Sequence, residues 1–375
     1  MRKLKNILVT GGCGFIGCNF IHYLFVFFTA GGKDFTDADF SGNIINVDCL
    51  TYAGNAESLN DIEKKYGKNS GNQRYFFEKV DICDRAEIER IFSQYDIDTV
   101  VHFAAESHVD RSILGPETFI KTNVMGTYTL LDVARKYWNV SLDNIRDDVL
   151  FHHISTDEVY GSLGDEGYFL ETTPYDPRSP YSSSKASSDH IVMAYYHTYG
   201  LPVTLSNCTN NYGPFQFPEK LLPLMINNIK TGKNLPVYGD GKNIRDWIYV
   251  EDHNRGVWEI VKKSPAGEKW NLGGENEWQN IKLLNTVIEL VSEELNLNSD
   301  DVKKTITYVK DRPGHDRRYA IDCSKAKNQL GWERKMTFEE GLRSTIKWYL
   351  SHDEWISHIL SGEYKDWINR NYEVR

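Results

Sequence analysis

The sequence has few cysteines, and the ones present are not grouped. Six cysteines, at positions 13, 18, 49, 83, 208 and 323, are spread over 375 residues without a Cys-x-x-Cys pair. This spacing is typical neither of a disulfide framework nor of a zinc site, and no histidine cluster supplies further ligands. We therefore expect reduced thiols, a cytoplasmic location and no bound metal.

Long apolar runs and an excess of positive charge are also missing. The longest apolar stretch, around residues 24–28, is far short of the about 20 residues that a helix needs to cross a bilayer. The N-terminus passes directly into a strand-like run at residues 7–9, which does not fit a signal peptide. The net charge of −10 argues against a nucleic-acid partner but leaves room for a local basic pocket.

Short apolar runs alternate with helical patterns in the first half of the chain. This alternation predicts an α/β fold, a Rossmann-like doubly wound parallel sheet with right-handed crossovers. We expect strands at 6–10, 43–48, 74–81, 99–104 and 149–155, and helices at 15–28, 85–94 and 118–137. Residues 29–42, rich in glycine and aspartate, are interpreted as an exposed inserted loop.

The pattern changes after about residue 205. Proline and glycine become more frequent, and helical patterns recur at 282–295 and 338–351. We divide the chain into a domain at 1–205 and a smaller mixed region at 206–375 that is partly interwoven with the first.

A glycine cluster follows the first strand and opens the first helix. Gly11 suits a tight turn, Gly14 a close approach of the backbone to a pyrophosphate, and Gly17 the packing of helix on strand. The free N–H groups of the helix N-terminus favour phosphate binding. The cluster therefore predicts dinucleotide binding.

Acidic residues end the next two strands. Asp48 stands where a carboxylate would bind the adenosine ribose and disfavour a 2′-phosphate, so NAD is expected rather than NADP. Its distance from the glycines exceeds the usual spacing of about 20 residues, which we attribute to the inserted loop. Asp81 ends the third strand and is placed to reach the adenine. A solvated strand-end carboxylate is the alternative for both.

Tyr181 and Lys185 form a Tyr-x-x-x-Lys pair behind Pro180, at the start of a predicted helix. The i,i+4 spacing places phenol and ammonium on one helix face. A free tyrosine, with a pKa of about 10, is a poor base, but a nearby ammonium and a cationic nicotinamide favour the phenolate. Tyr75 and Lys79 share the spacing in a strand-like segment, where it has no helical meaning.

Thr156, Asp157 and Glu158 follow the fifth predicted strand. In doubly wound sheets, ligands bind beyond the carboxyl ends of the strands. Two adjacent carboxylates are costly unless their pKa values separate, and such a pair suits one acid and one base. The alternative is a polar cap on a surface turn. Residues 104–108 end the preceding strand and are expected to line the same cleft.

Together these motifs resemble the extended short-chain dehydrogenase/reductase family. The resemblance rests on residues 11–17, 48–55 and 103–107 and on the Tyr181/Lys185 pair. Residues 155–161 (STDEVYG), 210–214 (NNYGP), 217–222, 245–247 and 311–319 are similar to the branch of this family that removes water from dTDP-glucose. That branch implies bound NAD, a nucleotide-sugar substrate, a role in deoxysugar (dTDP-rhamnose) biosynthesis and a homodimer formed through helices near 118–137 and 182–199.

The resemblance also implies a division of labour among the candidate catalytic residues. Tyr181 would deprotonate the C4 hydroxyl of glucose while hydride passes to NAD⁺, and Glu158 would remove the C5 proton. Asp157 would protonate the departing C6 hydroxyl, after which hydride returns to C6. Thr156 would bond the C4 oxygen, and Lys185 would orient the nicotinamide ribose. A UDP-sugar 4,6-dehydratase or a nucleotide-sugar epimerase stays open as the alternative, although epimerases generally lack the acid pair.

The family pattern assigns further residues to each ligand. Residues expected at the cofactor are Gly11, Gly14, Phe15, Ile16, Gly17, Asp48, Asp81, Ile82, Ala104, Thr122, Tyr181, Lys185 and Asn211. Residues expected at the nucleotide sugar are Ser107, Thr156, Asn210, Lys220, Leu221, Pro236, Tyr238, Arg245, Asn280, Arg312 and His315. Arg245 and Arg312 suit a diphosphate, because a guanidinium binds two oxygens at once. Cys13 replaces the usual alanine, and Asn207 replaces an expected arginine, which puts the support of the neighbouring loop in question.

Overall fold

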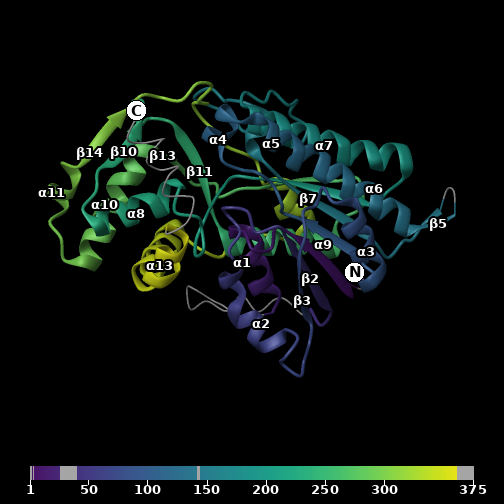
Figure 1. Cartoon of the computed structure of the whole chain (residues 1–375). Helices are drawn as coiled ribbons and strands as arrows, with labels where there is room; N and C mark the ends of the chain where they lie inside the picture. Colours follow the sequence, from purple (N-terminus) through teal and green to yellow (C-terminus); the bar gives the residue numbers. More distant parts are fainter. Residues whose placement is uncertain (1, 3, 26–39, 142–143, 361–375) are drawn as a thin grey trace.

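A seven-stranded parallel sheet forms the centre of the computed structural model, which describes residue 2 and residues 4–25, 40–141 and 144–360 (Figure 1). The strand order is β12-β8-β7-β4-β1-β2-β3, and every neighbouring pair is parallel. The strands are β1 (Asn6–Thr10), β2 (Asn43–Asp48), β3 (Tyr75–Lys79), β4 (Thr99–His102), β7 (Leu150–Thr156), β8 (Val203–Cys208) and β12 (Lys269–Leu272). The predicted Rossmann-like class is confirmed.

Helices cover both faces of this sheet, which explains the continuous apolar runs of its strands. Ile7 and Val9 pack in one apolar cluster with α1 (Phe15–Leu24) and α9 (Val250–Lys263). Leu8 points to the opposite face, into a second cluster. The helices of that face are α3 (Arg85–Tyr95), α6 (Thr127–Trp138) and α7 (Pro180–Tyr199). Because successive side chains of a strand alternate between faces, both faces require apolar residues.

The second half of the chain builds a smaller lobe and then returns to the large sheet (Figure 1). Its strands form two small sheets, β9 (Asn210–Tyr212) with β11 (Ile244–Tyr249) and β13 (Glu277–Gln279), and β10 (Leu235–Tyr238) with β14 (Ile306–Val309). Its helices are α8 (Leu221–Thr231), α10 (Asn280–Leu295), α11 (Ser299–Lys303), α12 (Ser324–Leu330), α13 (Phe338–Ser351) and α14 (Asp353–Leu360). Strand β12 lies at the edge of the large sheet beside β8, and α9 packs on α1, so this part of the second half lies within the first.

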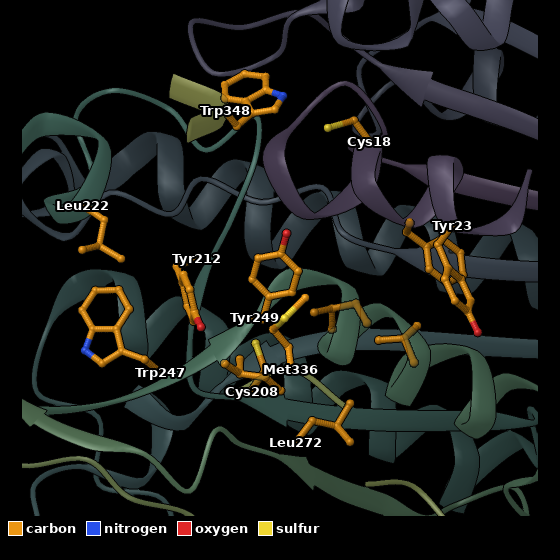
Figure 2. Packing of buried hydrophobic residues seen from close by; sticks show 14 of the residues in the cluster. Cys18, Tyr23, Cys208, Tyr212, Leu222, Trp247, Tyr249, Leu272, Met336 and Trp348 are labelled. Atoms are coloured by element: carbon orange, nitrogen blue, oxygen red, sulfur yellow. The ribbon is translucent and has the colours of Figure 1, made fainter. Parts of the chain in front are cut away.

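The apolar core is continuous between the two parts. Figure 2 shows Cys18 and Tyr23 of α1 in the same cluster as Tyr212, Trp247 and Leu272 from the second half of the chain. All five are nearly or fully buried. The shared core holds the loops of both parts in a fixed relation at the carboxyl edge of the sheet.

Several predicted boundaries differ from the structure. Helix α1 ends at Leu24, and residues 26–39, with most of the inserted loop, lie outside the described residues. The helix predicted at 118–137 is wrong as a single α-helix. It consists of α5 (Pro116–Phe119), a π-helical stretch η2 (Ile120–Gly126) and α6. A Cβ on Gly126 would lie 2.4 Å from Ile82, so the wider turn brings the backbone close to the cleft.

Smaller elements were not predicted. They are η1 (Ala56–Leu59), α2 (Asn60–Tyr66), α4 (Val109–Leu114), β5 (Asn139–Ser141), β6 (Asn144–Ile145) and η3 (Asp157–Tyr160). Over the described ranges, no helix has the length and apolar character needed to cross a membrane. All six cysteines are free thiols.

Candidate active site

The carboxyl ends of the central strands open into one cleft of about 470 Å³. Strands β1, β2, β4, β7 and β8 each deliver the residues that follow them to its wall. Because parallel strands point the same way, loops that are far apart in the sequence meet at this edge. The volume lies in the range of small-molecule sites.

The glycine loop forms one end of the cleft, and each glycine has a steric reason. Gly11 has φ +69°, and a Cβ there would lie 2.7 Å from the backbone of Ala104. A Cβ on Gly17 would lie 2.3 Å from the carbonyl oxygen of Gly11. Gly14 is the N-cap of α1, so the first N–H groups of the helix face the cleft without side chains in front of them. Cys13 fits its position, with its thiol buried beside Asn46.

Asp48 lines the cleft at the end of β2, where it is nearly buried. Its Oδ2 accepts a hydrogen bond from the Cys13 N–H at 3.0 Å, and its Oδ1 accepts one from the Leu50 N–H at 2.8 Å. Burial raises the pKa of Asp48, and these two N–H donors lower it again. The carboxylate retains acceptor capacity for hydroxyl groups in the cleft. Asp81 also lines the cleft.

The first two turns of α7 place Tyr181 and Lys185 in the cleft wall. Ser179 is the N-cap, Pro180 occupies the first helical position, and Ser179 and Ser182 form a capping box with two 3.0 Å hydrogen bonds. Both side chains of the pair are buried, with exposed fractions of 8% for Tyr181 and 4% for Lys185.

The acid pair lies on a short helical turn, η3, which Thr156 caps. The Thr156 hydroxyl donates to Asp157 Oδ1 at 3.2 Å and accepts from the Glu158 N–H at 3.3 Å. Asp157 is 2% exposed, and within the described part of the chain its Oδ2 has no hydrogen-bond partner. The turn therefore presents one carboxyl oxygen without a bond to protein in the cleft wall.

The environments of the two acids differ as an acid and a base require. Burial, followed by the charge of Glu158, raises the pKa of Asp157 well above its usual value. Burial also raises the pKa of Glu158, but Arg312, Arg245 and Lys220 lower it. Asp157 therefore favours the protonated form, and Glu158 is drawn toward the ionised form.

Tyr181 needs help to ionise. Burial and then the charge of Glu158 raise the pKa of its phenol well above 10, whereas the Thr156 hydroxyl lowers it. Lys185 donates to the carbonyl oxygen of Ile154 at 2.8 Å, and burial lowers its pKa to about 8. A positive charge bound beside the phenol would favour the phenolate.

All thirteen residues predicted for the cofactor line this cleft. Of the residues predicted for the substrate, Ser107, Thr156, Asn210 and Lys220 also line it. Lys220 donates to the carbonyl oxygen of Ser107 at 3.1 Å, so the loop before α8 reaches the loop after β4.

The other predicted substrate residues lie in the smaller lobe and do not line this cleft; they are Leu221, Pro236, Tyr238, Arg245, Asn280, Arg312 and His315. The ring centroids of Tyr238 and His315 lie 6.3 Å apart, and the Arg245 guanidinium lies 4.2 Å from the Tyr319 ring. Arg245 and Arg312 both lower the pKa of Glu158, so their positive charges act on the catalytic end of the cleft.

Two residues of the site have roles that the sequence did not indicate. Asn207 is fully buried in β8, where its amide donates to the Thr156 carbonyl oxygen at 2.9 Å and its Oδ1 accepts from the Tyr160 hydroxyl at 3.2 Å. It therefore supports the strand end that bears the acids, which answers the question raised by the missing arginine. Glu219 lines the cleft, and burial raises its pKa to about 7. No local pattern distinguishes either residue from an ordinary polar one.

The residues present fit a dinucleotide. At Gly11 and Gly17 there is no space for a side chain, and the start of α1 offers backbone donors. Asp48 stands at the end of the neighbouring strand with acceptor oxygens for ribose hydroxyls. A metal site is a separate matter: among the described residues, no group of three or more His, Cys, Asp or Glu side chains is placed to hold an ion.

Known nucleotide-sugar 4,6-dehydratases resemble this chain. The family model for GDP-mannose 4,6 dehydratase matches residues 8–345. The dTDP-glucose 4,6-dehydratase of Salmonella typhimurium is 51% identical over 379 residues, covering 99% of both chains.

Two solved structures share the fold over nearly the whole chain. One is a dTDP-glucose 4,6-dehydratase from Bacillus anthracis in complex with NAD, with 43% identity, a TM-score of 0.79 and coverage of 95% of this chain and 99% of that one. The other is a dTDP-glucose 4,6-dehydratase from Streptomyces venezuelae with NAD and dTDP bound, with 40% identity, a TM-score of 0.81 and coverage of 94% and 99%.

The support that Asn207 gives to Thr156 can be tested. Asn207→Ala leaves the Thr156 carbonyl oxygen without its amide donor, and we expect it to lower the free energy of unfolding by about 1–3 kcal/mol. Because the strand end loosens, turnover should fall as well. Denaturant unfolding and a steady-state assay measure the two effects.

Asn228→Ala is the matched control. It removes an amide-to-carbonyl bond of 2.8 Å, to Asn234, at the far end of α8. It should lower stability by a similar amount without lowering turnover. Equal losses of turnover in both variants would contradict the role of Asn207.

Proposed function

Because the chain belongs to the GDP-mannose 4,6-dehydratase family, we propose that it is an NAD-dependent hydro-lyase that converts dTDP-glucose to dTDP-4-keto-6-deoxyglucose. The observation that carries this proposal is the acid pair. Asp157 and Glu158 line the same cleft as Tyr181, and their surroundings separate their ionisation. Oxidation at one carbon needs one base, whereas elimination of water needs an acid and a further base.

The proposed steps follow from the ionisation of these side chains. When bound, NAD accepts a hydride from C4 of the sugar and returns it to C6. Tyr181 takes the proton of the C4 hydroxyl, and Thr156 bonds the C4 oxygen. The resulting carbonyl acidifies C5, and Glu158 takes the C5 proton. Asp157, whose pKa burial raises, gives its proton to the C6 hydroxyl, which leaves as water. When the hydride adds to C6, Glu158 returns its proton to C5. The proton that Tyr181 took from the C4 hydroxyl replaces, through solvent, the one that Asp157 gave up.

Positive charge near the acids suits a nucleotide diphosphate. Lys220 lies in the cleft wall, and Arg245 and Arg312 lower the pKa of Glu158 from the side of the smaller lobe. The Arg245 side chain is nearly buried and donates to the carbonyl oxygens of Ile244 and Asp316 at 2.8 and 3.0 Å. We propose that these cations face the diphosphate while the sugar reaches the acid pair.

The activity itself is the first test. Purified protein should convert dTDP-glucose to a 4-keto-6-deoxy sugar, detected by its absorbance in alkali, without added reductant, because the hydride removed from C4 is returned to C6. UDP-glucose and UDP-galactose are the comparison substrates. Equal or faster turnover of UDP-glucose would assign the protein to UDP-sugars, and C4 inversion without loss of water would make it an epimerase.

The roles of Glu158 and Tyr181 can be tested separately. Glu158→Gln should permit oxidation at C4 but slow the elimination, with a loss of turnover of about 10²–10⁴-fold. The absorbance of reduced nicotinamide should therefore build up after substrate is mixed with the variant. Tyr181→Phe, the comparison variant, should show no such absorbance. If Glu158→Gln also shows none, Glu158 acts before the elimination and its assigned role is wrong.

We further propose that the protein is a homodimer that pairs through α4, η2, α6 and α7. Helices α6 and α7 lie side by side in Figure 1, and α4 and η2 pack against α7. This surface carries large exposed apolar side chains: Leu114, Ile120, Met125, Tyr128 and Tyr199. Exposed apolar patches of this kind are typical of contact surfaces.

The free thiols suit a reducing compartment, so the cytoplasm stays the expected location.

Sedimentation tests the dimer. Met125→Lys, at a position 51% exposed, should shift the protein toward a monomer because it places a charge in the apolar contact. Val140→Lys, at a position 67% exposed on β5, is the control and should leave the dimer intact. A wild-type monomer, or a Met125→Lys dimer as stable as wild type, would contradict this surface.

A further inference from the structure

Asp189 is a buried carboxylate that the reaction described above does not use. It lies one turn beyond Lys185 on α7, is 1% exposed and does not line the cleft. The i,i+4 spacing places the two side chains on the same face of the helix. Isolated carboxylates are rarely buried to this extent, because the loss of hydration is costly.

The carboxylate of Asp189 is held from outside its own helix. Its Oδ2 accepts hydrogen bonds from the Ser155 hydroxyl at 2.8 Å and from the Tyr175 hydroxyl at 2.9 Å. Its Oδ1 lies 3.2 Å from Nε2 of His153. Ser155 and His153 belong to β7, the strand that ends at Thr156. Asp189 therefore joins α7 to the strand that bears the acid pair.

The same strand contacts Lys185. The Lys185 Nζ donates to the carbonyl oxygen of Ile154 at 2.8 Å and lies 3.4 Å from Nε2 of His153. His153 is fully buried, and burial, followed by the charge of Lys185, lowers the pKa of its imidazole well below 6.5. A neutral imidazole therefore lies between the ammonium of Lys185 and the carboxylate of Asp189.

Lys185 and Asp189 each favour the charged form of the other. Burial lowers the pKa of Lys185 to about 8, and the negative charge of Asp189 is the largest effect that raises it. Burial raises the pKa of Asp189, and Lys185 is the largest effect that lowers it. Lys269, on β12, also favours the ionised carboxylate, and Cys208, on β8, also favours the ammonium. The neighbouring imidazole of His102 is neutral, because burial lowers its pKa.

We infer that Asp189 is a positioning residue whose carboxylate, fixed by Ser155 and Tyr175, keeps Lys185 charged beside Tyr181 and so sets the ionisation of the catalytic phenol. The inference rests on the proposed function only for its kinetic consequence. The pairing of Asp189 with Lys185 is a property of the fold and is testable without turnover.

The kinetic test is the pH dependence of Asp189→Asn, which keeps the shape of the side chain and removes its charge. Lys185 should then lose its proton at a lower pH, so the ammonium beside Tyr181 should be present over a narrower pH range. The alkaline limb of the kcat/KM profile should move down by about one pH unit. The loss should be about tenfold above the limb and should diminish as the pH falls.

Tyr175→Phe is the matched control for a structural role. It removes one hydrogen bond to Asp189 but leaves the carboxylate charge in place. It should lower the Tm without moving the pH profile. If both variants leave the alkaline limb in place, or if both move it equally, Asp189 does not act through its charge and the inference is overturned.

Thermal unfolding gives a readout that needs no activity. A buried charge without its partner is destabilising, whereas removal of both partners is often tolerated. Asp189→Asn and Lys185→Met should each lower the Tm, and the double variant should lose clearly less than the sum of the two. Additive losses would overturn the pairing even if dTDP-glucose proves not to be the substrate. If Asp189→Asn alone fails to fold, recovery of folding in the double variant supports the pairing, and failure of both overturns it.

Discussion

Burial of ionisable side chains at the carboxyl edge of the sheet is the constraint on which the site depends. Asp157, Tyr181 and Lys185 are each less than 10% exposed. In water, these side chains would have ordinary pKa values and no capacity for both acid and base chemistry near neutrality. Loss of hydration raises the pKa of Asp157 and lowers the pKa of Lys185, and nearby charges then adjust the pKa of each group.

Hydrogen bonds to the polar groups around the site offset part of the free-energy cost of this burial. The capping box of Ser179 and Ser182 fixes the start of α7, and Thr156 caps the turn that bears the acids. Asn207 bonds the strand end from β8, and the Ile154 carbonyl oxygen accepts a hydrogen bond from Lys185. The polar network behind the cleft therefore holds reactive groups that would otherwise turn toward solvent.

The two parts of the chain contribute different properties to the reaction. The large sheet supplies the glycine loop, the phenol and the acid pair, while the smaller lobe supplies Arg245 and Arg312. These two cations keep Glu158 closer to its ionised form than Asp157, although the two acids are neighbours in the sequence. Tyr212 and Trp247 pack in the same apolar cluster as α1 (Figure 2). This shared core fixes the position of the smaller lobe relative to the large sheet.

The amino-acid sequence by itself determined the sheet class, the glycine loop and the identity of the reactive groups, because these depend on local patterns: strand alternation, glycine spacing and the i,i+4 pair of Tyr181 and Lys185. Only the tertiary structure decided which polar residues support them. Asn207 and Glu219 have no local signature, since their partners lie on other strands and loops. Asp189 follows Lys185 at i,i+4, but its hydrogen-bond partner Ser155 lies on β7. Gly126, at the end of the π-helical stretch Ile120–Gly126, likewise lies close to Ile82, which is too far away in the chain for a short pattern to reveal.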